Sequence, residues 1–149
     1  MRPFAFRLAT ILALWQQRED AALKELHRKQ VAHRAALARV ADLRDARAHA
    51  SRDMYARTPR SSEPHDPSWH RNWIKHLSLA IDDALADAGR RAADERAAQL
   101  AWQRARRDRR VLDRLRDRAH RRHQVEMRRE EMKLFDELAG LRPRKERTW

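Results

Sequence analysis

Apolar residues recur every three or four positions over the first third of the sequence. The stretch from Phe4 to Arg57 contains neither glycine nor proline. This periodicity places one apolar stripe along a continuous helix, and helices of such length are typical of coiled coils. We therefore predict helix one over about 4–57. The positions that form its stripe are Leu8, Leu12, Trp15, Ala22, Leu23, Leu26, Leu37, Val40 and Leu43.

A second periodic stretch follows a short segment of a different composition. Prolines 59, 64 and 67 lie among serine and acidic residues, and proline disrupts a helix because it lacks the amide donor and clashes with the preceding turn. We predict a proline-rich turn at 58–68, helix two over about 69–139 and a frayed tail at 140–149, all in a single helical-hairpin domain, 1–149. Ser68 can cap the second helix, whereas Gly140 and Pro143 favour its end.

If the turn near residue 63 brings the two helices together antiparallel, facing residues have numbers that add up to roughly 126. We expect an all-α fold with two long helices forming an antiparallel coiled-coil hairpin, the second helix longer. Its last turns, roughly from His120, then extend past Phe4 and carry an exposed apolar set that calls for a partner. The residues expected in the coiled-coil seam are Leu12, Trp15, Leu26, Leu37, Val40, Ile81, Trp102 and Leu112.

Composition favours this narrow architecture. Charged residues make up 38% of the 149 residues, so few large apolar side chains remain for a thick core. The formal net charge of +13 indicates an acidic protein surface, a nucleic acid or an anionic membrane as a partner. The sequence has no cysteine, and no apolar run approaches the roughly 20 residues of a membrane span.

The sequence offers little support for catalysis or for a metal site. His120 and His123 have a chelating spacing on a helix, but nothing nearby supplies a third ligand. The two glycines cannot form a phosphate-binding loop, and the serines lie in no nucleophile context. We therefore expect no enzyme activity, no cofactor and no metal.

Three motifs resemble the FliJ family, a coiled-coil component of the flagellar type III export apparatus. The first is Phe4–Leu8 with the apolar residues that follow it, and the second is Asn72-Trp73-Ile74 after the turn. The third is the close at 129–139, with its pattern of acid, lysine, apolar residues and Asp-Glu. Length and hairpin layout agree as well, so the resemblance covers nearly the whole chain.

The resemblance implies a stalk-like protein that binds a FliI-like export ATPase hexamer, a FlhA-like export gate and export chaperones. It implies a cytoplasmic location, peripheral at the inner face of the membrane. The expected ATPase-contact residues are Phe4, Phe6, Leu8, Arg118, Arg122, Arg129, Lys133 and Phe135. The expected export-gate contacts are Leu43, Trp73, Leu77 and Leu79.

Two alternatives stay open at this point. The first is the equivalent YscO-type stalk of a virulence type III secretion system, which genomic neighbours would separate from a flagellar protein. The second is a basic coiled-coil protein that binds nucleic acid. The arginines of 104–129 lack interleaved exposed aromatic residues, which disfavours this second alternative.

Overall fold

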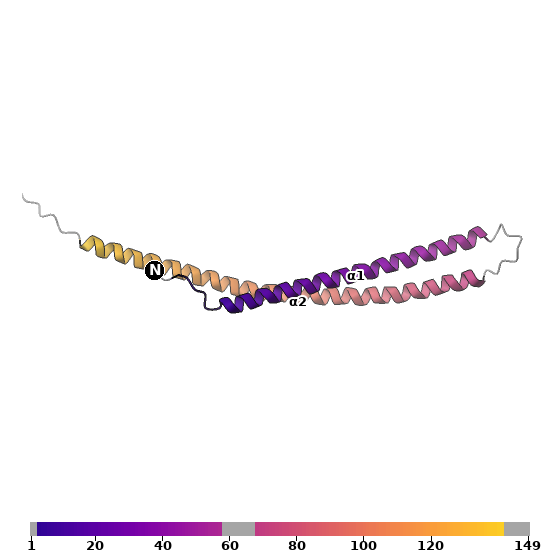
Figure 1. Ribbon diagram of the computed structural model, residues 1–149, viewed down its shortest axis with the longest axis horizontal. Coiled ribbons are helices and arrows are strands. Elements are labelled where there is room, and N and C mark those ends of the chain that lie inside the picture. Colours follow the sequence, from indigo (N-terminus) through magenta and orange to yellow (C-terminus); the bar gives the residue numbers. More distant parts are fainter. Residues whose placement is uncertain (1–2, 58–67, 142–149) are drawn as a thin grey trace, which may run out of the picture. The chain divides into compact units, whose positions relative to one another are not determined.

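The computed structural model describes residues 3–57 and 68–141 and contains two helices (Figure 1). Helix α1 spans Ala9–Arg57 and helix α2 spans Ser68–Gly140, with 49 and 73 residues. No strand occurs among the described residues. The prediction of an all-α hairpin whose second helix is longer is confirmed.

The start of α1 differs from the prediction by five residues, because the helix begins at Ala9 and not at Phe4. The first hydrogen bonds of the helix run from the amide of Ala9 to the carbonyl of Phe6 and from Leu12 to Leu8. Before them, Phe4, Phe6 and Leu8 are half-buried while the residues between them are exposed. Residues 3–6 have no regular secondary structure and 7–8 form a turn, so these residues do not belong to the helix that the sequence predicts from Phe4.

The other helix boundaries lie close to the prediction. Helix α2 begins at Ser68 and ends at Gly140, where the amide of Leu141 donates to the carbonyl of Glu137 at 3.1 Å. Most of the predicted turn at 58–68 and of the predicted tail at 140–149, namely 58–67 and 142–149, lies outside the described residues. The chain divides into a middle unit, Asp20–Arg104, and a terminal unit made of Met1–Glu19 and Ala105–Trp149. That the chain forms a single domain stays a prediction.

In the middle unit α1 and α2 run antiparallel (Figure 1) around a core of small residues. Ala36 and Val40 of α1 pack against Ala84 and Ala88 of α2, and the partly buried Leu43 packs against this cluster. Small side chains let the two backbones approach, so a seam of this kind needs few large apolar residues.

Three polar pairs connect the helices of the middle unit and define their register. Nδ1 of His33 lies 2.6 Å from Oε2 of Glu95, and the Lys29 ammonium lies 4.0 Å from the Asp94 carboxylate. A guanidinium nitrogen of Arg47 lies 3.5 Å from the hydroxyl of Ser78. In these pairs the two residue numbers add up to between 123 and 128. These sums agree with the value of roughly 126 expected for facing residues, so the predicted register of the two helices is confirmed.

The structure places most of the expected seam residues in the interior, with one correction. Leu37 has an exposed fraction of 48%, so it lies outside the seam. Its neighbour Ala36 and, one turn later, Val40 take the seam positions, and successive residues are about 100° apart around a helix. Trp15 and Trp102 are half-buried. The buried members of the expected set are Leu12, Leu26, Val40, Ile81 and Leu112.

In the terminal unit, α1 and α2 are joined by a charged cluster beside the buried Leu12 and Leu112. The guanidinium of Arg109 in α2 donates to Glu19 of α1 and to Asp113 of its own helix. The hydrogen bond with Glu19, helped by the charges of both carboxylates, raises the pKa of Arg109. Arg109 therefore stays charged and links the two helices near the start of α1.

Candidate partner-binding site

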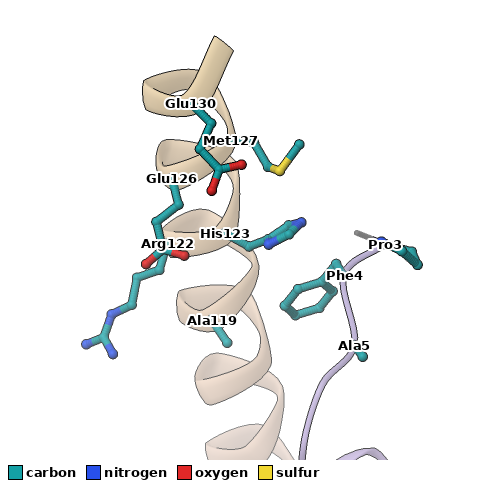
Figure 2. A pocket seen from close by; sticks show the side chains of 9 residues that line it. All are labelled: Pro3, Phe4, Ala5, Ala119, Arg122, His123, Glu126, Met127 and Glu130. Atoms are coloured by element: carbon teal, nitrogen blue, oxygen red, sulfur yellow. The ribbon is translucent and has the colours of Figure 1, made fainter. Parts of the chain in front are cut away.

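The N-terminal segment packs against α2 through the ring of Phe4. The ring centroid of Phe4 lies 4.9 Å from that of His120, with the rings at 80°, and 5.7 Å from that of His123. Edge-on contacts of this kind are favourable for aromatic rings. Figure 2 shows the Phe4 ring, His123 and Met127 on the side of α2 that faces the segment.

A cavity of about 740 Å³ lies between this segment and α2. Its apolar wall comes from Phe4 and Met127, and its polar wall comes from Arg122, Glu126 and Glu130 of α2 (Figure 2). The cavity is open and carries charge of both signs. It has the features of a protein contact surface and lacks a convergent set of groups for a small ligand.

Beyond this cavity, α2 continues with exposed apolar residues, which no other part of the described chain covers. Phe135 has an exposed fraction of 70%, and Leu134 and Leu138 lie beside it along a shallow groove whose wall also includes Glu131. All residues from Arg128 to Leu141 are exposed. A monomeric protein rarely exposes such a run, so this segment, which we call the α2 overhang (128–141), is a candidate binding surface.

His120 and His123 both contact the Phe4 ring, and among the described residues no group of three or more potential ligands lies together. The pair therefore has a packing role against the N-terminal segment. The described residues also contain no stretch of helix apolar and long enough to traverse a bilayer.

The hairpin, the N-terminal segment and the α2 overhang can be compared with known proteins. The model of the family described as "Flagellar FliJ protein" matches residues 4–148. The chain belongs to the FliJ family. No curated protein and no solved structure matches the chain. FliJ proteins are non-catalytic components associated with flagellar type III export, and family membership implies partners within the export apparatus.

The residues expected to contact the export ATPase in this FliJ protein all belong to one unit of the structure. This is the terminal unit, in which the apolar ones at the start are half-buried and those on α2 are exposed. The first group is Phe4, Phe6 and Leu8, and the second is Arg118, Arg122, Arg129, Lys133 and Phe135. Sequence reasoning missed the cavity residues Pro3 and Ala5, whereas Met127, which lines the same cavity, belongs to the apolar set expected on the last turns of helix two.

The residues expected to contact the export gate lie in the middle unit but differ in accessibility. Trp73 and Leu79 are exposed, and the Trp73 ring stacks on His76 with centroids 5.6 Å apart. Leu77, in contrast, has an exposed fraction of 4%, and Leu43 packs against the core cluster. Leu43 and Leu77 therefore hold the helices together. Of the four expected gate contacts, Trp73 and Leu79 are accessible to a partner.

Proposed function

We propose that this FliJ protein is a stalk-like binding component that engages the FliI-like export ATPase hexamer through its terminal unit. The observation that carries the proposal is the exposed α2 overhang, in which Leu134, Phe135 and Leu138 line one groove. Apolar anchors of this kind supply binding energy at protein interfaces, and the charged side chains around them are of both signs. We propose no reaction for the chain itself.

A second contact is proposed for the FlhA-like export gate, through Trp73 and Leu79. Both side chains are exposed on α2 in the middle unit, and an exposed tryptophan is a frequent anchor of protein interfaces. Export chaperones are a third class of partner. Their contact residues are not assigned. The proposed location is the cytoplasm, at the inner face of the membrane through the export apparatus.

A crossed pair of variants tests both contacts at once. Leu134→Ser/Leu138→Ser removes apolar surface from the overhang, and Trp73→Ser/Leu79→Ser removes it from the gate surface. We expect the first variant to lose stimulation of the cognate export ATPase while it still binds the gate domain. The second variant should show the opposite pattern. If the wild-type protein changes neither hexamer formation nor ATP turnover of the ATPase, the proposal fails.

Two other functions stay as alternatives with simple tests. A YscO-type stalk would act on an injectisome ATPase, so binding assays with both ATPases distinguish it from the flagellar protein. A nucleic-acid binder would bind DNA or RNA with an affinity that falls steeply with salt, because phosphate contacts release counterions. The absence of measurable affinity at low salt would eliminate that function.

A further inference from the structure

A groove in the middle unit has no role in the function proposed above. It lies between α1 and α2, has a volume of about 930 Å³ and includes Leu23, Leu26 and Val31 of α1 and Trp102 of α2. Leu23 and Val31 are about half exposed, with fractions of 47% and 50%. Exposed aliphatic side chains beside a tryptophan form an apolar surface that another protein segment can cover.

The shape of this groove fits a helix. Leu23, His27 and Val31 are spaced four apart along α1, so they form a ridge along one side. Gln99 and Trp102 of α2 form the other side. The ridge from Leu23 to Val31 is on the order of 12 Å long, about two helical turns. Two ridges with an apolar surface between them are the setting in which an amphipathic helix binds.

The rim of the groove is positively charged. The cationic side chains of Lys24 and Arg28 line it, and none of its lining residues is acidic. Glu25 lies outside the groove and holds the Arg28 guanidinium through two hydrogen bonds of 3.0 and 2.8 Å. Arginine has five donors, so Arg28 keeps others for a partner. The cavity of the terminal unit and the overhang groove both contain glutamates, which sets this rim apart.

We infer that this groove binds an acidic amphipathic helix of a partner protein, with its apolar face on Leu23, Val31 and Trp102 and its carboxylates at Lys24 and Arg28. A second copy of the chain is the less suitable occupant, because a protein of net charge +13 repels its own copies. The inference is independent of the ATPase and gate contacts, since it uses none of their residues.

The probe for this inference is a designed peptide of three heptads with leucine core positions and flanking glutamates. Its twin carries lysine at every glutamate position. The full-length protein is labelled with fluorotryptophan, and the Trp102 signal is assigned through Trp102→Phe. We expect the acidic peptide to shift the ¹⁹F resonance of Trp102 and leave that of Trp73 unchanged. The basic twin should shift neither.

Two matched pairs of variants locate the contact. Lys24→Gln/Arg28→Gln should weaken binding of the acidic peptide by about tenfold, whereas Arg71→Gln/Lys75→Gln, with the same spacing on exposed α2 positions, should not. Leu23→Gln should also weaken binding, and Leu100→Gln, exposed to a similar extent outside the groove, should not. Circular dichroism confirms that each variant is folded.

Three results would overturn the inference. The first is equal binding of the acidic peptide and its basic twin, or no binding of either. The second is an acidic peptide that binds without moving the Trp102 resonance. The third is self-association of the wild-type protein that Leu23→Gln abolishes, because a second copy would then occupy the groove.

Discussion

Nδ1 of His33 in α1 lies 2.6 Å from Oε2 of Glu95 in α2, and each side chain is about one quarter exposed (25% and 27%). The pair connects two helices whose core at this level consists mainly of small residues. Because small apolar residues tolerate several registers, a directional polar contact between the helices favours one of them. The His33–Glu95 pair is thus a register-determining contact of the middle unit.

A double-mutant cycle with His33→Gln and Glu95→Gln measures this contact. We expect a coupling energy of about 0.5–1 kcal/mol at neutral pH, since both side chains are partly exposed and solvent screens their interaction. Urea unfolding of the wild type, both single variants and the double variant provides the four free energies. Additive effects of the two substitutions would mean that the side chains do not interact in solution.

A second prediction compares two leucines of the same helix. Leu26 has an exposed fraction of 6% and Leu37 one of 48%. Leu26→Ala should lower the free energy of unfolding by about 2–3 kcal/mol, because it empties a buried position. Leu37→Ala should lower it by less than about 1 kcal/mol. Equal losses in thermal or chemical unfolding would place Leu37 back in the seam.

The fold could be predicted largely from the sequence because the apolar period and the prolines each point to the same hairpin. The register followed from helix rise alone and agrees with pairs such as Lys29 and Asp94. Leu37 was misplaced because Ala36 and Leu37 are adjacent apolar residues, and periodicity alone does not say which one faces the partner helix. Burial selects Ala36, since its small side chain lets the backbones approach.

The candidate site was predicted in part. The apolar character of the overhang is visible in the sequence, whereas the contact of Phe4 with His120 and His123 depends on a non-helical segment for which the apolar period predicts helix. The predicted register places Glu19 and Arg109 nearly opposite each other, because their numbers add up to 128. Several arginines of α2 lie near this level, so the residue type alone does not predict which of them binds Glu19.

A third prediction concerns Phe4. Phe4→Ala should release the N-terminal segment from α2, because the ring supplies the contacts with His120 and His123. In NMR spectra the imidazole protons of both histidines should lose the ring-current shift of Phe4, while the cost in unfolding free energy stays near 1 kcal/mol. Phe135→Ala is the matched control, since its ring is exposed and should leave both histidines unchanged. Unaltered histidine shifts in Phe4→Ala would contradict the packing described.

A fourth prediction follows from the Glu25 carboxylate. The hydrogen bond from Arg28, with the charges of Arg28 and Lys29, lowers the pKa of Glu25 below its ordinary value of 4.5. A lowered pKa means that the ion pair stabilises the folded state above pH 4.5 and that this contribution is lost as the pH falls through the folded-state pKa. Carboxyl ¹³C titration should show a midpoint below 4.5 that rises in Arg28→Gln. An identical midpoint in both proteins would rule out the effect of Arg28.

We propose that the α2 overhang is the end of this FliJ protein that binds the export ATPase. Site-specific photo-cross-linking tests it most directly, with a photoreactive amino acid in place of Phe135 and, as a control, in place of the exposed Asp82 of the middle unit. In the presence of the cognate ATPase hexamer, we predict a cross-link to the ATPase from position 135 and none from position 82. Cross-links from position 82 alone, or from neither position while the two proteins still form a complex, would contradict the claim.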